Sequence, residues 1–150
     1  MARIQHIAIF AKDNAALAEF YKTTFGLEEV FRQPSGKDRE AYYLSDGHIN
    51  LAILPAGPNR KEGIDHFGLQ VEDVTALSES AERNGAQNGA TDVPRDGRFA
   101  DGFILDPVGT RVDISVEGWA VTRVAETPEQ RAAAKKAQDK LPIAIETPGT

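Results

Sequence analysis

The chain has 150 residues, 41% of them apolar and 27% charged, a balance typical of one globular domain rather than of a disordered chain. Its formal net charge of -6 argues against a nucleic-acid surface, which needs a basic face. The absence of cysteine excludes disulfides, zinc–thiolate sites and thiol nucleophiles. No apolar run reaches the roughly 18 residues of a membrane span, and the amino-terminal residues lack the apolar run of a signal peptide. These totals predict a cytoplasmic protein with neither nucleic acid nor a membrane as partner.

The first third of the chain predicts a strand, a helix and three further strands. Residues 4–10 alternate in the manner of a strand, with His6 among the residues of one face. Residues 15–25 carry apolar side chains at helical spacing, between a capping Asp13 and a terminating Gly26. Strand-like runs follow at residues 28–32, 40–44 and 49–54.

The same order is predicted again after a Pro- and Gly-bearing linker at residues 55–63. Residues 64–71 read as a strand and residues 73–84 as a helix that Asp73 can cap. Short strands are predicted at residues 86–89, 102–105 and 111–116.

The two halves align as an internal repeat. Residues 4–7 (Ile-Gln-His-Ile) match residues 64–67 (Ile-Asp-His-Phe) at an offset of 60, and the capping aspartates match at the same offset. We therefore interpret the chain as a duplicated βαβββ unit, with module 1 at about residues 2–55 and module 2 at about 63–117. Together they form a single domain at residues 1–118.

The carboxy-terminal part, residues 119–150, has no counterpart in the first half. Residues 127–130 (Thr-Pro-Glu-Gln) are typical of a helix start, and residues 130–140 are rich in alanine and lysine. We expect a C-terminal helical extension that packs over its own domain or over a partner subunit.

Three side chains that can bind a metal lie on strands predicted to share one sheet face: His6, His66 and Asp113. In each of these strands the bulky apolar residues occupy the other face, which should pack against the helices. If the sheet curls into a cup, the three side chains converge. Two neutral imidazoles and one carboxylate leave coordination positions open on a divalent ion, so that a substrate can chelate it and be polarised. The plainer interpretation is that each histidine is a structural residue of its strand.

The sequence resembles the vicinal oxygen chelate superfamily of glyoxalases, bleomycin-resistance proteins and extradiol dioxygenases, over about residues 2–117. The resemblance depends on His6, on the Phe25-Gly26-Leu27 helix exit, on His66-Phe67, and on residues 106–114, which resemble the family's "DP-x-G-x-x-(apolar)-E-(apolar)" strand. It implies an α+β fold in which two tandem βαβββ modules form a U-shaped eight-stranded mixed sheet, here followed by the C-terminal helical tail. It also implies a metal ion inside the sheet.

The resemblance leaves the number of ligands open. Relatives similar to glyoxalase and methylmalonyl-CoA epimerase have a fourth ligand on the last strand of module 1, which counting from the turn glycine places at Leu51. Leucine cannot bind a metal, and Asn50 takes this place only if the register differs by one residue. Three ligands are more similar to the extradiol dioxygenases, which hold Fe(II) with two histidines and a carboxylate. Asp113 stands where glutamate is usual, which shortens the reach by about one bond length. The expected cofactor is one divalent metal ion, with Fe(II) favoured and Mn, Ni and Zn open.

Five other residues are candidates for the site. Tyr42 and Tyr43 adjoin on one strand, so one of them should face the cup and donate a hydrogen bond to a substrate oxyanion as a catalytic residue. Arg95 and Arg98 lie in a loop and are candidates for binding an anionic substrate, with solvated surface arginines as the alternative. Gln70 shares a face with His66 and is expected at the rim of the cavity.

These residues indicate a metal-dependent enzyme acting on a small molecule with two adjacent oxygens. Extradiol ring cleavage is the leading expectation, because the fourth ligand is missing. The first alternative is a glyoxalase-like lyase or an epimerase or other isomerase acting through an enediolate, which needs a general base that the sequence does not identify. The second is a metal-free antibiotic-binding resistance protein, against which the retained ligands argue. By resemblance, we expect a homodimer.

Overall fold

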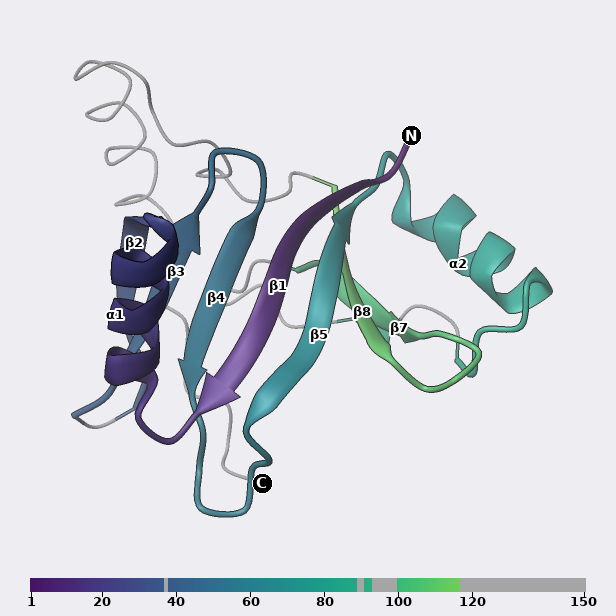
Figure 1. Ribbon diagram of the computed structural model, residues 1–150. Helices are drawn as coiled ribbons and strands as arrows, with labels where there is room; N and C mark the ends of the chain where they lie inside the picture. Colours follow the sequence, from purple (N-terminus) through teal and green to yellow (C-terminus); the bar gives the residue numbers. More distant parts are fainter. Residues whose placement is uncertain (37, 89–90, 93–99, 117–150) are drawn as a thin grey trace.

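Over the residues that it describes, the computed structural model shows a single curved β-sheet with two helices (Figure 1). The described parts of the chain are residues 1–36, 38–88, 91–92 and 100–116. The C-terminal helical extension predicted at residues 119–150 lies outside them.

The elements follow the order strand, helix and three strands, twice over. The first set is β1 (Arg3–Ala11), α1 (Asn14–Phe25), β2 (Glu28–Pro34), β3 (Glu40–Ser45) and β4 (Asn50–Pro55). The second set is β5 (Gly63–Gln70), α2 (Val74–Arg83), β6 (Thr91–Asp92), β7 (Gly102–Leu105) and β8 (Arg111–Ser115).

The eight strands form one mixed sheet in the order β2-β3-β4-β1-β5-β8-β7-β6. The first strands of the two sets, β1 and β5, are antiparallel neighbours at its centre, and each is also parallel to the last strand of its own set, β4 and β8 respectively. The predicted α+β class with a mixed sheet is confirmed. Neither α1 nor α2, the helices that the described residues contain, has the length and apolar character needed to cross a membrane.

Both helices begin and end where the sequence predicts. The Asp13 side chain accepts a hydrogen bond from the Ala16 backbone at 3.0 Å, and the Asp73 side chain accepts one from the Ala76 backbone at 2.9 Å. Gly26 ends α1 in the left-handed conformation, with φ 71°, which glycine adopts without strain.

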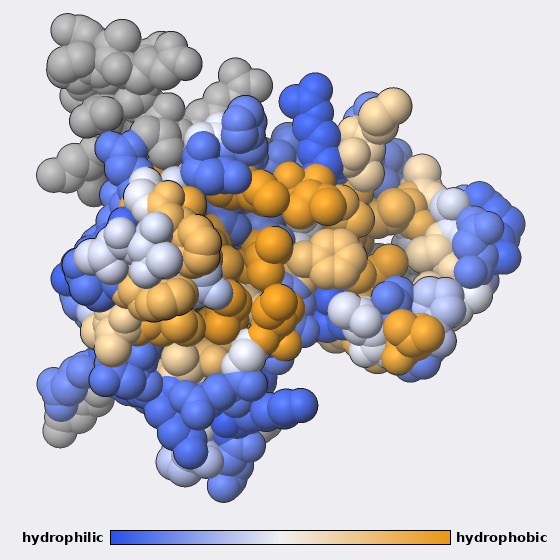
Figure 2. Space-filling model, in the orientation of Figure 1, coloured by the Kyte–Doolittle hydropathy of each residue, from blue (hydrophilic) through white to orange (hydrophobic). Residues whose placement is uncertain are grey.

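The two faces of the sheet have different environments. The helix face carries α1 and α2, and Figure 2 shows apolar side chains gathered between them. Its buried cluster contains Ala18, Leu44 and Ile53. The opposite face, called the inner face here, has a buried cluster of mostly small residues, Ala8, Ala41, Tyr43 and Ala52. Small side chains leave room above this face for polar groups.

The strand predicted at residues 86–89 is wrong at residues 86–88, and residue 89 lies outside the described residues. Residues 86–88 form no strand, and the pairing with β7 begins at β6 instead. The Gln87 backbone does donate to the carbonyl of Leu105 at 2.9 Å, but the Leu105 backbone donates to the Asn88 side chain at 2.5 Å. A side chain therefore replaces the backbone acceptor that a ladder would use.

A β-bulge interrupts the alternation of β1. Ile4 pairs with Leu69 and His6 pairs with Gly68, so Gln5 is an extra residue between the two pairs. Paired residues share a face, so Ile4 lies with Leu69 on the helix face and not, as strict alternation predicted, beside His6. Gln5 and His6 are both buried.

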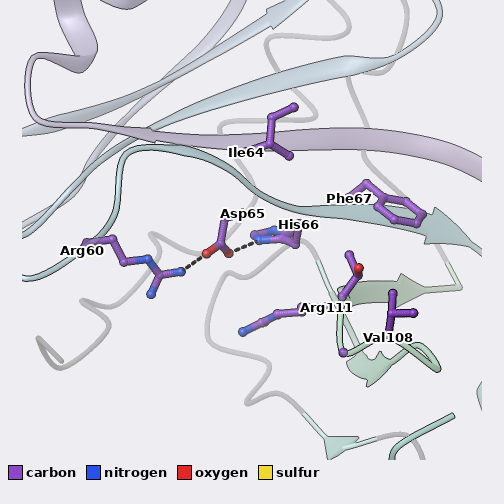
Figure 3. Close-up of a pocket in the computed structure, with 9 residues that line it drawn as sticks. Arg60, Ile64, Asp65, His66, Phe67, Val108 and Arg111 are labelled. Carbon is purple, nitrogen blue, oxygen red and sulfur yellow. Dashed lines mark hydrogen bonds and ion pairs between the residues drawn. The ribbon is translucent and has the colours of Figure 1, made fainter.

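A second bulge interrupts β5. Ala8 pairs with His66 and Ile9 pairs with Ile64, so Asp65 is the extra residue on this strand. Figure 3 shows the consequence: the Ile64 side chain points to one side of the strand, and Asp65 and His66 point together to the other.

Candidate metal centre

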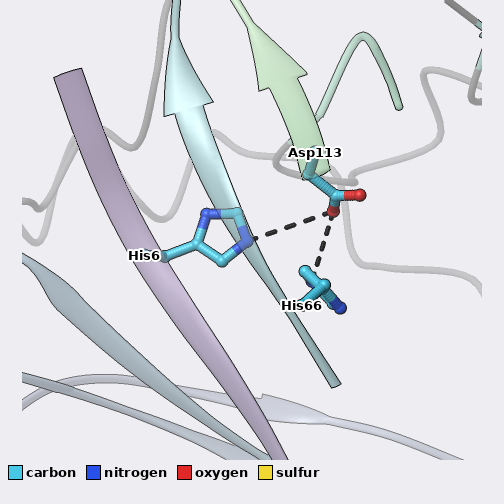
Figure 4. A group of neighbouring side chains, drawn as sticks. All are labelled: His6, His66 and Asp113. Carbon is cyan, nitrogen blue, oxygen red and sulfur yellow. Dashed lines mark ion pairs between the residues drawn. The ribbon is translucent and has the colours of Figure 1, made fainter. Parts of the chain in front are cut away.

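The structure brings His6, His66 and Asp113 together from three adjacent strands, β1, β5 and β8 (Figure 4). One ligand atom from each lies within 4.8 Å of the others. The Asp113 Oδ2 atom is 3.3 Å from Nε2 of His66 and 4.0 Å from Nε2 of His6. His6 and Asp113 are buried, at 3% and 7% exposure.

These donors fit a divalent ion of the first transition series. Metal bonds of about 2.1 Å place neighbouring donors roughly 3.0–3.4 Å apart in octahedral or tetrahedral geometry. The contact of Asp113 with His66 already has this separation, and the contact with His6 needs to close by about half an ångström. Two imidazoles and one carboxylate suit iron, manganese, nickel or zinc better than the all-oxygen preference of calcium or magnesium.

The protonation states of His6 and Asp113 already suit metal binding, whereas His66 must release a proton to bind a metal. Burial, followed by the nearby charge of His66, lowers the pKa of His6 to about 3, so this imidazole is neutral at neutral pH. Burial lowers the pKa of His66, but hydrogen bonds to Asp113 and Asp65 outweigh it, so the pKa lies above its ordinary value. Burial raises the pKa of Asp113, yet His66 and Arg111 outweigh that effect and hold the carboxyl ionised.

Asp65 fixes the orientation of His66. Its Oδ2 atom lies 2.7 Å from Nδ1 of His66, and its Oδ1 atom accepts from Arg60 at 2.5 Å (Figure 3). With a metal ion on Nε2, the one remaining ring proton of His66 would lie on Nδ1 and be held by this carboxylate. A carboxylate behind a ligand histidine is the usual outer partner in metal sites. Strict alternation had placed Asp65 on the helix face, so the sequence analysis missed it.

Asp113 has an outer partner of its own. The Arg111 side chain donates through Nε to Oδ1 of Asp113 at 2.7 Å, and its guanidinium lies 4.5 Å above the ring of Phe103. The other oxygen, Oδ2, is the one that faces both histidines. Arg111 therefore orients the carboxylate with one oxygen toward the site.

The His6 ring lies directly over Gly68, its partner in the ladder. A Cβ atom on Gly68 would be 2.1 Å from Cε1 of His6 and 2.4 Å from Nδ1. Only glycine leaves room for the ring in this position.

Asn50 lies next to His6 on the inner face, and this corrects the sequence analysis. In the parallel ladder of β1 and β4, Asn50 pairs with His6, whereas Leu51 pairs with Ile7 and packs in the helix-face cluster. The predicted register was therefore off by one. Asn50 is 1% exposed; its Nδ2 donates to the Gln5 carbonyl at 3.4 Å, and its Oδ1 has no hydrogen-bond partner among the described residues.

The two candidate tyrosines lie on opposite faces. Tyr43 belongs to the inner-face cluster and its hydroxyl donates to Gln33 at 3.2 Å. Burial raises the pKa of Tyr43 far above its ordinary value, so it stays a neutral hydrogen-bonding group. Tyr42 packs on the helix face under the guanidinium of Arg32. A catalytic role of either tyrosine stays a prediction.

Gln70 makes hydrogen bonds to its neighbours, and the two arginines predicted to bind an anionic substrate are not among the described residues. The Gln70 side chain accepts from Gln5 and donates to the carbonyl of Val116, both at 3.0 Å. Arg95 and Arg98 lie outside the described residues. Two other arginines, Arg60 and Arg111, do lie beside the site.

Arg60 and Arg111 line a pocket of about 500 Å³, and His66 of the candidate metal centre also lines it (Figure 3). The pocket lies between the start of β5 and the turn before β8, where Val108 and Thr110 form part of its wall. A substrate bound there would lie against a candidate metal ligand.

The curled mixed sheet carries a trio of candidate metal ligands on one face. The family model described as "Glyoxalase/Bleomycin resistance protein/Dioxygenase superfamily" matches residues 3–114, and the chain belongs to this superfamily.

Individual proteins are also similar to this chain, one in sequence and two in fold. The uncharacterized protein PA2024 of Pseudomonas aeruginosa is 27% identical over an alignment of 122 residues, and the match covers 75% of this chain and 86% of that protein. The hypothetical protein BH1468 of Bacillus halodurans has a similar structure, with a TM-score of 0.57 at 17% identity, over 75% of this chain and 92% of that one. A methylmalonyl-CoA epimerase of Streptomyces coelicolor, in complex with 2-nitronate-propionyl-CoA, has a TM-score of 0.58 at 22% identity, over 75% of this chain and 94% of that one.

Proposed function

We propose that the chain is a metal-dependent enzyme of the isomerase or lyase type that acts on a small molecule with two adjacent oxygens. The observation that carries this proposal is the position of Asn50. It pairs with His6 on the inner face, and its buried Oδ1 has no partner among the described residues.

Asn50 changes the expected number of ligands. The expectation of a ring-cleaving dioxygenase depended on three ligands and a missing fourth. An amide oxygen beside His6 supplies a fourth donor, and burial without a hydrogen bond would otherwise cost free energy. Four protein donors leave fewer open positions, which suits chelation of a substrate without a separate site for O₂.

The residues around the ion then have separate roles. His6, His66, Asp113 and Asn50 would hold the metal, and a divalent ion bound there would act as a Lewis acid on a substrate carbonyl. Asp65 would hold the Nδ1 proton of His66, so that Nε2 faces the ion, and Arg111 holds one oxygen of the Asp113 carboxylate so that the other faces the site. The small residues Ala8 and Ala52 leave space beside the ligands on the inner face.

Metal analysis and hydrogen exchange test this proposal. Protein purified without a histidine tag should contain close to one equivalent of a divalent transition metal. Incubated in D₂O with methylmalonyl-CoA, the thioester named with solved structures of this fold, or with 2-hydroxy and 2-oxo acids, it should catalyse exchange of the proton next to the carbonyl. Absence of exchange with every acid and thioester tried would contradict the isomerase or lyase function, and absence of bound metal would favour the antibiotic-binding alternative.

Two substitutions test the fourth ligand. Asn50→Leu should weaken Mn²⁺ binding by about 10–100-fold, and Asn50→Asp should restore it because a carboxylate oxygen can take the same position. Unchanged affinity in Asn50→Leu would return the count to three ligands.

A ring-cleaving dioxygenase is the second candidate, favoured by the two-histidine, one-carboxylate set, which is typical of non-haem Fe(II) oxygenases. Fe(II)-loaded protein should then consume O₂ with a catechol and form a coloured product. We also propose a homodimer, as the family resemblance implies, and light scattering on a sizing column tests it.

A further inference from the structure

Two arginines stand beside the candidate metal centre, each held in place from two sides. Arg60 contacts Asp65 at 2.5 Å and lies 4.1 Å from the centre of the Phe10 ring. Arg111 contacts Asp113 at 2.7 Å and lies over Phe103. A guanidinium stacked on an aromatic ring and paired with a carboxylate loses little further freedom when it binds a ligand.

Each arginine keeps donors for a ligand. A guanidinium has five N–H groups, and the hydrogen bonds to described residues use only Nη2 of Arg60 and only Nε of Arg111. Both side chains line the pocket that borders His66, and both are about one-third exposed, at 36% and 38%. The remaining N–H groups can therefore reach a molecule in the pocket.

The local charge favours an anion. The two arginines cancel the charges of Asp65 and Asp113, so a divalent ion held by neutral imidazoles leaves the centre with an excess of two positive charges. This excess contrasts with the net charge of -6 of the whole chain. A neutral chelating substrate would leave it uncompensated in a partly buried site.

We propose that this pocket binds a carboxylate of the substrate, so that the substrate class is a small carboxylate that also carries two adjacent oxygens. The planar fork of a guanidinium matches a carboxylate with two parallel hydrogen bonds. The Val108 side chain in the same wall suits the carbon skeleton between the two polar ends. This inference rests on the proposed metal centre and names the substrate class of that site.

The test compares two chelators of the same shape that differ in charge. Mn²⁺-loaded protein under argon is titrated by calorimetry with 3,4-dihydroxybenzoate and with 3,4-dihydroxybenzamide, and then with the 2,3-isomers of both. At least one isomer should bind at least about tenfold more tightly as the carboxylate, the effect of one additional well-placed ion pair. Equal binding of acid and amide in both isomers would overturn the proposal.

Charge-removing variants locate the effect. Arg60→Gln and Arg111→Gln should each reduce the preference for the acid, whereas Arg83→Gln, which removes an exposed arginine of α2, should leave it unchanged. Mn²⁺ affinity is measured first for every variant, because Arg111 touches a candidate ligand. A preference that survives in both pocket variants would also refute the proposed subsite.

The two proposals fail in different ways. If the wild-type protein binds no Mn²⁺, the metal centre is refuted, and the same acid and amide are titrated into the metal-free protein. A preference for the acid that Arg60→Gln removes would then support the anion pocket alone, and no preference would overturn it.

Discussion

Replacement of Gly68 by alanine should disrupt the candidate metal centre without changing a ligand. The added methyl group would lie 2.1 Å from Cε1 of His6 and 2.9 Å from Nε2, whereas unbonded heavy atoms have an optimal separation of about 3.5–4.0 Å. The ring must therefore retreat by roughly 1 Å or more from a site where it is 3% exposed.

This displacement affects stability and metal binding separately. Overpacking of a buried site costs about 1–3 kcal/mol of unfolding free energy. At this chain length that corresponds to a fall in Tm of roughly 4 °C per kcal/mol. Metal–ligand distances tolerate only about 0.2 Å, so a ring moved by 1 Å leaves the coordination sphere. Mn²⁺ affinity should therefore fall by at least about 100-fold, the upper end of the effect of losing an outer partner.

Thermal melts and calorimetric titration with Mn²⁺ measure the two effects. Gly57→Ala is the matched control, because its Cβ would meet nothing within 4 Å. The double variant His6→Ala/Gly68→Ala should regain much of the Tm lost in Gly68→Ala, since the clash is gone, but no metal affinity. Wild-type Tm and wild-type Mn²⁺ affinity in Gly68→Ala would refute the reasoning.

Four further predictions concern the surroundings of the site. Asp65→Asn keeps an acceptor for the His66 ring but removes its charge, and should lower Mn²⁺ affinity by about 10–100-fold in calorimetry, with little change if Asp65 is only structural. The raised pKa of His66 stabilises the metal-free fold below pH 6.5, and this contribution is lost as the pH rises through the folded-state pKa. Metal binding has the opposite pH dependence, because His66 must release a proton to bind the ion. The Mn²⁺ dissociation constant should rise about tenfold for each pH unit below the pKa of His66, which corresponds to one proton, because His6 is already neutral. A hundredfold rise per pH unit, which corresponds to two protons, would contradict this. Tyr43→Phe removes a buried hydrogen bond to Gln33 and should cost about 1–2 kcal/mol in chemical denaturation while Mn²⁺ affinity stays the same, and a large drop in turnover at unchanged stability would instead support a catalytic hydroxyl.

Local sequence patterns were sufficient for much of the fold. The caps Asp13 and Asp73 and the terminating Gly26 predicted both helices, because each provides a hydrogen bond or a backbone conformation that a helix end requires. The strand predicted at residues 86–89 was wrong at residues 86–88 because Asn88 satisfies the backbone of Leu105 with its side chain. Hydrophobic periodicity does not indicate where a side chain replaces a backbone hydrogen-bond acceptor.

The register of β4 shows a second limit. Counting from a turn glycine assumes a fixed length for the turn, and here the count placed Leu51 where the ladder places Asn50. The sequence signal was that Asn50 is a polar residue at the start of an otherwise apolar strand, as expected for a residue on the inner face. Only the pairing with His6 could decide between the two residues, because pairing is a long-range property.

The bulges explain the largest difference between the predicted and the observed site. Each of the two central strands has one extra residue, Gln5 on β1 and Asp65 on β5, and each directly precedes a candidate ligand histidine. The internal repeat had aligned these two residues, but neither is a glycine or another residue that marks a bulge, so strict alternation sent both side chains to the helix face. In the structure, the bulge instead turns Asp65 to the side of His66, where it holds the imidazole at 2.7 Å. A regular strand would present the same histidine to the inner face without the carboxylate behind it, so the bulge in β5 is the feature of the fold that supplies the outer partner of the proposed metal ligand.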